Sequence, residues 1–283
     1  METPPKIAVR SLVLTGFGIN CEEELAAAYA MSNAIADIVH LNDILLQGFD
    51  IHAYDILNFP GGFSFGDDIA SGRVLANKIR HKQLLSGKTL LDEIKLFLAS
   101  GKYILGICNG FQVLVKLGLL PDIGGNTEQE VTLSRNHSGK YENRWCYVKV
   151  SKHVKTPFLK DLDVFSVPVR HGEGRLLIKN PEIQNLIVQQ GLNCLSYCDP
   201  HGNLTEQYPL NPNGSALCCA GLTNATGQVF GMMPHPEAYL SLYNHPNWAQ
   251  IKRQNPYISE EGEGLSLFKN IVRHIFDKKG IAT

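Results

Sequence analysis

The chain has 283 residues, of which 44% are hydrophobic and 19% charged, a length that suits one large α/β domain or two small ones. A formal net charge of −1 and a sequence pI of about 6.8 argue against a nucleic-acid-binding protein, which would carry a basic face. No apolar run is long enough to span a membrane and the N-terminus lacks a signal-peptide layout, so neither nucleic acid nor membrane is an expected partner.

The first 120 residues alternate between apolar runs typical of strands and amphipathic runs typical of helices. The pattern predicts strands at Ile7–Leu14, Ile35–Leu41, Tyr54–Phe59 and Tyr103–Ile107, and helices at Glu22–Ser32, Arg73–Leu85, Leu90–Ala99 and Gly110–Leu117. Such alternation indicates a largely parallel sheet with helices on both faces, in which ligands bind at the carboxyl ends of the strands. Two glycine-bearing loops follow such ends, PGGFSFGDD after the third predicted strand and CNG after the fourth.

The second half of the chain predicts additional, antiparallel strands separated by turns such as NPNGS. The candidate strands are Trp145–Val150, Phe165–Val169, Leu186–Gln190, Ala216–Leu222 and Gln228–Met233, and a final helix, Leu265–Phe276, is expected to pack back on the sheet. Because no linker separates the halves, we expect a single domain over residues 1–283. Its motif-bearing core would run from about 7 to about 239, with a C-terminal extension at about 242–283.

Seven cysteines are scattered along the chain. An odd number in a long chain fits reduced thiols better than a disulfide framework, and therefore predicts a cytoplasmic protein.

GICNGFQ, residues 106–112, places a cysteine between two glycines where an apolar strand gives way to a helix. A G-x-C-x-G turn here is typical of a nucleophile elbow, in which a tight turn strains the backbone of the nucleophile and flanking glycines relieve the crowding. The sulfur would project at the top of the sheet, where the positive end of the helix favours the thiolate. The alternative is a buried structural cysteine, but with these flanks Cys108 is the candidate nucleophile.

A nucleophilic thiol needs a base, and GMMPHPEAY offers one directly after the last predicted strand. Pro236 restricts His235 to extended backbone, and in an extended chain His235 and Glu237 would point the same way. His235 could then reach the thiol while Glu237 holds the imidazole in one tautomer, as in serine-type triads. The alternative is a proline-rich turn with exposed polar side chains, but the order Cys108, His235, Glu237 favours a triad.

An acyl intermediate at Cys108 also needs hydrogen-bond donors for its oxyanion. The N–H of Asn109, at the start of the helix, is one candidate. Gly61 and Gly62, on the loop of the neighbouring strand, could supply another, because glycine lets a backbone N–H approach a ligand closely. An ordinary Pro-Gly turn is the alternative there.

Three further patterns resemble ligand sites but lack part of the required motif. GFGINC, residues 16–21, lacks the third glycine of a dinucleotide fingerprint, and SGKT, residues 86–89, lacks the first glycine of a P-loop. Cys194, Cys198 and His201 offer three ligands without the second pair of a structural zinc site. We therefore expect no cofactor and no metal site in this chain.

Taken together, five motifs resemble the class I glutamine amidotransferase family: PGGFSFGDD, GICNGFQ, HGEGR, NPNGS and GMMPHPE. Their combination resembles most the branch that provides the glutaminase component of phosphoribosylformylglycinamidine synthase, in purine biosynthesis. The resemblance runs from about Ile7 to about Tyr239. It implies a flavodoxin-like α/β fold and hydrolysis of glutamine to glutamate and ammonia through a γ-glutamyl thioester.

The resemblance also implies roles for individual residues. Cys108 would be the nucleophile, His235 the general base and acid, and Glu237 the residue that orients His235. The oxyanion surroundings would be Gly61, Gly62 and Asn109, and the glutamine pocket would be lined by Gln112, His171, Gly172 and Glu173.

The ammonia would pass to an ATP-dependent synthetase subunit, with a small third subunit as an optional further component. ATP and Mg²⁺ would belong to that partner, because this chain carries no visible ATP site. Residues 135–144 and the stretch from Leu242 onward depart from the short stand-alone subunit, so the mode of docking stays open.

Two other functions stay open beside this one. An elbow-type cysteine hydrolase could act on another substrate, and alkylation of Cys108 by glutamine analogues would separate it from a glutaminase. A non-catalytic regulatory subunit of the same fold is disfavoured, because all three residue types of the triad are present at suitable places.

Overall fold

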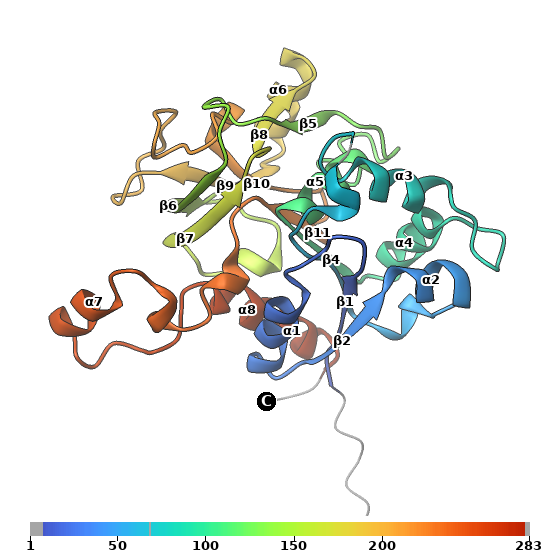
Figure 1. Cartoon of the computed structure of the whole chain (residues 1–283), viewed down its shortest axis with the longest axis horizontal. Helices are drawn as coiled ribbons and strands as arrows, with labels where there is room; N and C mark the ends of the chain where they lie inside the picture. The colour runs from blue at the N-terminus through green and yellow to red at the C-terminus, as the bar shows by residue number, and fades with distance from the viewer. Residues whose placement is uncertain (1–7, 68, 281–283) are drawn as a thin grey trace, which may run out of the picture.

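A nine-stranded sheet forms the centre of the molecule in the computed structural model, which describes residues 8–67 and 69–280 (Figure 1). The strand order is β2-β1-β3-β4-β11-β10-β9-β6-β7, and the first five of these strands pair in parallel while the others pair antiparallel. The strands are β1 Arg10–Thr15, β2 Ile35–His40, β3 Ile56–Phe59, β4 Tyr103–Ile107, β6 Glu142–Val150, β7 Val164–His171, β9 Asn193–Cys198, β10 Cys219–Thr223 and β11 Val229–Met232. The predicted largely parallel α/β fold with additional antiparallel strands is therefore confirmed.

Helices cover the sheet, and a small second sheet pairs β5 Val131–Ser134 with β8 Arg175–Ile178. The α-helices are α1 Glu22–Met31, α2 Leu41–Gln47, α3 Arg73–His81, α4 Leu90–Ala99, α5 Asn109–Lys116, α6 Pro181–Gln189, α7 Trp248–Gln254 and α8 Leu265–Lys278. Short 3-10 turns lie at Ile51–Ala53, Ser64–Asp67, Pro157–Leu159, Ala216–Cys218, Pro236–Ala238 and Leu242–Asn244. Within residues 8–67 and 69–280, none of the helices combines the length and apolarity that crossing a bilayer requires.

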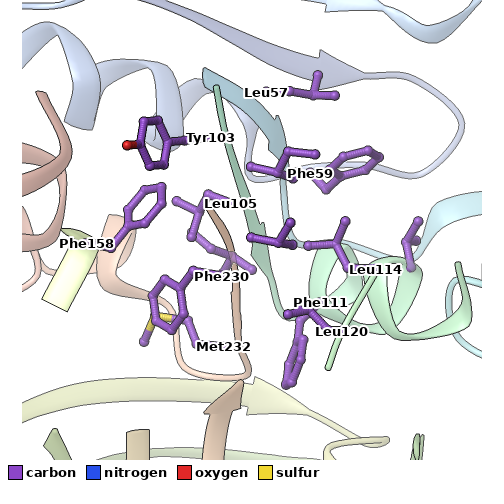
Figure 2. Close-up of a cluster of buried hydrophobic side chains, with 14 of the residues drawn as sticks. Leu57, Phe59, Tyr103, Leu105, Phe111, Leu114, Leu120, Phe158, Phe230 and Met232 are labelled. Carbon is purple, nitrogen blue, oxygen red and sulfur yellow. The ribbon is translucent and has the colours of Figure 1, made fainter. Parts of the chain in front are cut away.

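The core lies on both faces of β4 and β11, the strands that lead into the candidate site (Figure 2). On one face, Phe230 of β11 packs against Phe158, with ring centroids 5.6 Å apart. On the other face, Phe111 and Leu114 of α5 cover the strands, and both side chains are buried. Because β4 is buried along its whole length, its carboxyl end is a rigid platform for the residues that follow.

The final helix packs against the body of the protein, as the sequence predicts. Ile271 and Phe268 of α8 belong to the buried core, and the ring of Phe268 meets that of Tyr29 in α1 at 5.2 Å. By contrast, α7 projects away from the sheet on the orange segment of Figure 1 and has no buried residue. The division into domains stays a prediction, although strands from both halves of the chain join one sheet.

One predicted strand is wrong. Leu186–Gln190 was expected to be extended because Leu, Ile and Val favour strands, but most of it lies in α6. Asn180 caps that helix by accepting a hydrogen bond from the N–H of Ile183, and Pro181 occupies its first turn. These two residues are a helix start signal that outweighs β propensity. The strand of this region, β9, begins three residues after the predicted segment ends.

Other boundaries differ by a few residues. Ile7, the predicted start of the first strand, lies outside the described residues, and the described strand begins at Arg10. Helix α3 ends at His81 rather than Leu85. Helix α4 and strand β4 have the predicted bounds, and a reciprocal capping box of Thr89 and Asp92 fixes the start of α4.

Candidate active site

Cys108 stands at a strained turn between β4 and α5. Its backbone angles are φ 50° and ψ −105°, and its N–H donates to Met232 O at 2.8 Å, which ties the turn to β11. Both flanking glycines are required by close packing: a Cβ on Gly110 would lie 1.8 Å from Phe59 O, and one on Gly106 would lie 2.8 Å from the carbonyl carbon of Gly110. The strained elbow and its glycines thus have the geometry that the sequence predicts.

His235 and Glu237 form a buried pair at the end of β11. His235 Nδ1 lies 2.6 Å from Glu237 Oε1, and each residue is 3% exposed. The predicted reason for their contact is wrong in part, because Glu237 lies in the 3-10 turn Pro236–Ala238 rather than in an extended chain. The N–H of His235 donates to Pro168 O at 2.8 Å, which anchors the base to β7.

The surroundings of His235 favour its charged form. Burial alone would lower the pKa of His235, but the carboxylate of Glu237 and the thiols of Cys108 and Cys21 outweigh it, so the pKa is well above its ordinary value. The Sγ of Cys108 lies 3.7 Å from the carbonyl oxygen of Arg170 on β7. A thiol beside a protonated imidazole is the arrangement in which cysteine becomes nucleophilic.

The loop after β3 places Gly61, one of the candidate oxyanion residues, beside the imidazole of His235. Gly62 has a φ of +139°, and a Cβ on it would lie 2.6 Å from Gly18 O, so only glycine fits against the neighbouring loop. Two hydrogen bonds join the loop after β1 to the loop after β3. The N–H of Asn20 donates to Gly61 O at 3.2 Å, and the N–H of Phe63 donates to Gly18 O at 2.8 Å. Gly18 therefore lies at the junction of two loops, whereas Gly16 packs against the ring of His40, where a Cβ would lie 2.6 Å from Nε2. These packing roles explain a pattern that resembles a nucleotide site.

Asn109 connects this loop to the elbow. Its Oδ1 accepts a hydrogen bond from the N–H of Ser64 at 3.1 Å, and its Nδ2 donates to Gln112 Oε1 at 2.9 Å. The side chain of Asn109 thus positions the loop and Gln112, while the backbone N–H of Asn109 lies in the first turn of α5.

The predicted pocket residues continue this network. Gln112 Nε2 donates to the carbonyl oxygen of Glu173 at 2.5 Å, and Glu173 Oε2 accepts from the N–H of Ser71 at 3.2 Å. Gly172 is half-buried, with open space where a side chain would be, since its nearest neighbour is Tyr141 at 3.9 Å. The structure therefore brings Gln112, Gly172 and Glu173 together on one side of the elbow.

His171 is placed differently from its neighbours in HGEGR. It is 2% exposed, its Nδ1 lies 3.1 Å from Asn136 Oδ1, and a Cβ on Gly174 would lie 2.6 Å from its ring. Burial and the charge of His235 lower the pKa of His171 to about 3. His171 is thus a neutral, packed residue that supports the segment, and its predicted place in the glutamine pocket stays a prediction.

Two residues near the site escaped the sequence analysis. Cys21, after β1, lies beside the imidazole of His235, and its pKa is raised by burial. Tyr141 is half-exposed and close enough to Cys108 and His235 for their charges to affect its pKa, which burial raises. The position of Cys21 after the end of a parallel strand was the available signal, because such ends converge on one edge of the sheet.

Chemically, the arrangement suits acyl transfer: a strained thiol at a helix start, an imidazole whose pKa is raised by a buried carboxylate, and glycine-lined backbone beside the imidazole. Comparisons with known proteins agree with this chemistry. Residues 8–275 match the family described as the CobB/CobQ-like glutamine amidotransferase domain. The chain is also similar to the phosphoribosylformylglycinamidine synthase subunit PurQ of Methanococcus maripaludis, with 41% identity over 95% of this chain and 98% of the relative.

Two further relatives extend this similarity. The subunit PurQ of Dehalococcoides mccartyi is 38% identical over 94% of this chain and 97% of its own length. Among solved structures, a chain of PurLQS from Thermotoga maritima superposes with a TM-score of 0.68 and 26% identity, over 95% of this chain and 100% of that chain.

Proposed function

This chain belongs to the CobB/CobQ-like glutamine amidotransferase domain family, and from that premise we propose that it is the glutaminase subunit of a phosphoribosylformylglycinamidine synthase. The observation that carries the activity is the pairing of His235 with Glu237 beside the strained elbow of Cys108. The relatives that carry the name of the synthase subunit span nearly the whole chain, which supports the choice of synthase over other amidotransferases.

In the proposed reaction, the thiolate of Cys108 attacks the γ-carboxamide carbon of glutamine and forms a tetrahedral intermediate. The N–H groups of Asn109 and of the Gly61-Gly62 segment stabilise its oxyanion. The imidazolium of His235 protonates the departing nitrogen as the carbon–nitrogen bond breaks, which releases ammonia and leaves a γ-glutamyl thioester. The high pKa of His235 suits this step, because the residue begins the reaction charged.

In the second half of the reaction, the neutral imidazole takes a proton from water, and the hydroxide attacks the thioester. The carbon–sulfur bond then breaks, glutamate leaves, and the thiolate of Cys108 is restored beside a protonated His235. Glu237 accepts the Nδ1–H of His235 throughout, so Nε2 stays directed to the reaction.

Glutamine would lie against Gln112, Gly172 and Glu173. A half-buried backbone segment beside a carboxylate suits the α-ammonium group of an amino acid, and Glu173 is the acidic residue of this segment. His171 would keep this segment in place through the contact of its Nδ1 with Asn136 Oδ1.

The ammonia would pass to an ATP-dependent synthetase subunit that holds ATP and Mg²⁺, with a small third subunit as an optional component, while this chain itself uses no cofactor. The name PurLQS of the Thermotoga assembly supports a partner of this kind. The decisive experiment measures ammonia release from glutamine with and without a candidate synthetase. A hydrolase for another substrate would release none, and a non-catalytic subunit would also resist alkylation of Cys108 by a glutamine analogue.

A further inference from the structure

The NPNGS turn, residues 211–215, takes no direct part in the proposed reaction, yet Asn211, Asn213 and Ser215 are all buried. The side chains of the turn bond to its own backbone. Asn211 Oδ1 accepts a hydrogen bond from the N–H of Gly214 at 2.9 Å, and Asn213 Oδ1 accepts one from the N–H of Ser215 at 3.0 Å. A buried polar network whose members bond to one another is rigid, so the groups that this turn presents to its neighbours have fixed positions.

The neighbour of this turn is the segment 172–174, which the proposed function places against glutamine. Ser215 Oγ accepts a hydrogen bond from the N–H of Leu176, directly beyond the segment, at 2.9 Å. The hydroxyl proton of Ser215 has two acceptors within reach, Asn213 Oδ1 at 2.7 Å and Gly174 O at 3.2 Å. A Cβ on Gly174 would lie 2.9 Å from Asn213 Nδ2, so the segment packs directly on the turn.

Asn136 holds the same segment by a second set of hydrogen bonds. Its Oδ1 accepts from the N–H of Gly174 at 3.0 Å, and its Nδ2 donates to His171 O at 2.8 Å. The N–H of the next residue, His137, donates to Asn213 O at 2.9 Å, which joins Asn136 to the NPNGS turn. The backbone on both sides of Glu173 is therefore held by one connected network.

We propose that three buried residues position the glutamine pocket: Asn136, Asn213 and Ser215. We call these three residues the pocket clamp. The inference rests on the proposed function, because that function assigns the segment 172–174 to glutamine. The segment is also tied to the helix of the elbow, since Gln112 Nε2 donates to the carbonyl oxygen of Glu173. The pocket clamp thus sets where Glu173 lies relative to the elbow, although its own residues need not touch the substrate.

The pocket clamp should act on binding rather than on the chemical step. Cys108 is placed by the turn between β4 and α5, and His235 is placed by Glu237 and by the backbone of β7. Loss of a hydrogen bond from the clamp would therefore shift the groups that hold glutamine and leave the thiol and the imidazole in place. Contacts that are equally strong in the ground state and the transition state affect KM and leave kcat unchanged.

The first test compares KM with kcat. Ser215→Ala and Asn136→Ala are assayed beside wild type and Ser196→Ala, a control that removes another buried hydroxyl, one that bonds to Asn193 in β9. Both clamp variants should raise KM for glutamine roughly 10-fold, the effect of one lost hydrogen bond, and change kcat less than about 3-fold. Ser196→Ala should change neither constant.

Ser215→Ala removes one hydroxyl group only, so it keeps this test decisive if Asn136→Ala does not fold. An unchanged KM in folded Ser215→Ala, or a loss of kcat as large as the rise in KM, would overturn the positioning role.

The second test needs no turnover. Cys108 is alkylated by a chloroketone analogue of glutamine and, separately, by iodoacetamide, which carries neither α-group of an amino acid, and peptide mass spectrometry follows the modification of Cys108. Ser215→Ala should react roughly 10-fold more slowly than wild type with subsaturating analogue and at the wild-type rate with iodoacetamide. Equal slowing with both reagents would overturn the positioning role, because the nucleophile itself would have changed. A wild-type chain that the analogue labels no faster than iodoacetamide does would overturn the proposed function instead.

Discussion

Gly61 faces the ring of His235 so closely that a Cβ on Gly61 would lie 2.8 Å from His235 Cε1. Two features therefore fix the position of the imidazole: Glu237 holds it by a hydrogen bond, and Gly61 leaves the space that the ring occupies.

Gly61→Ala should displace the imidazole and lower the rate of glutamine hydrolysis by roughly 100-fold, because small displacements of catalytic groups have effects of this size. Gly124→Ala is the matched control, since a Cβ there would meet only the Asn126 side chain at 3.5 Å. Steady-state glutaminase assays of both variants decide, and full activity of Gly61→Ala would mean that the ring can move without consequence.

Cys108→Ala should abolish glutamine hydrolysis, by at least about a thousand-fold, since no thioester can form without the sulfur. The assembled complex should still make product from free ammonium, because the synthetase reaction does not need the thiol. Retention of most of the glutaminase activity would show that Cys108 is not the nucleophile.

Glu237→Gln should also slow turnover, but the loss of rate should be roughly 10- to 100-fold smaller than the loss caused by Cys108→Ala. The reason is that Glu237→Gln removes the group that orients His235 but leaves the thiol and the base in place. Binding of glutamine should change little. Comparison of kcat with KM checks this, and a loss of binding as large as the loss of rate would place Glu237 in the substrate pocket.

His171 should make the protein sensitive to acid. Its pKa is lowered to about 3 in the folded chain, against 6.5 for an ordinary histidine, so the unfolded state binds a proton that the folded state refuses. The stabilising effect is present above pH 6.5 and is lost as the pH falls from 6.5 towards 3, at up to about 1.4 kcal/mol per pH unit.

Urea unfolding at a series of pH values measures this slope. His171→Gln should be less stable at neutral pH because the packing around Asn136 and Gly174 is disturbed. Its free energy of unfolding should nevertheless fall less steeply in acid. An equal slope for both proteins would show that other groups determine the acid sensitivity.

The isolated chain should hydrolyse glutamine slowly, and the synthetase with its nucleotides should raise kcat more than it lowers KM. The PGGFSFGDD loop carries a proposed oxyanion donor, and Phe63 on it and Phe17 on the adjoining loop are 47% and 41% exposed, where a partner could press on both loops. Oxyanion donors act chiefly on the transition state, so their alignment changes rate more than binding. Full-rate hydrolysis by the chain alone would show that the site is already aligned.

The parallel half of the sheet could be predicted from sequence because its helices and strands carry clear local signals at their ends. Helix α4 begins at a capping box and β4 is a short, wholly apolar run, so both have the expected bounds. The antiparallel half was harder, since β9 is a polar-interrupted run, NCLSYC, whose burial depends on partners far away in sequence. In α6, the start signal of Asn180 and Pro181 outweighs the β propensity of the Ile and Val residues after it.

The residues of the site divide in the same way, into those that local sequence constrains and those that long-range packing places. Cys108 and His235 could be found because glycine and proline constrain their backbones locally. Cys21 could not be found that way, because its meeting with His235 depends on how the loop after β1 packs against Gly61. The contact of His235 with Glu237 was expected, but it arises from a 3-10 turn that a single proline does not specify.

The place of β11 in the sheet has a consequence for protein synthesis. This strand is the last of the described strands along the sequence, yet it inserts between β4 and β10 and leads directly into His235. A growing chain that has emerged only through β10 still lacks His235, the base of the proposed site. We therefore expect the reactive site to assemble only once β11 has joined the sheet, so that an unfinished chain would not hydrolyse glutamine.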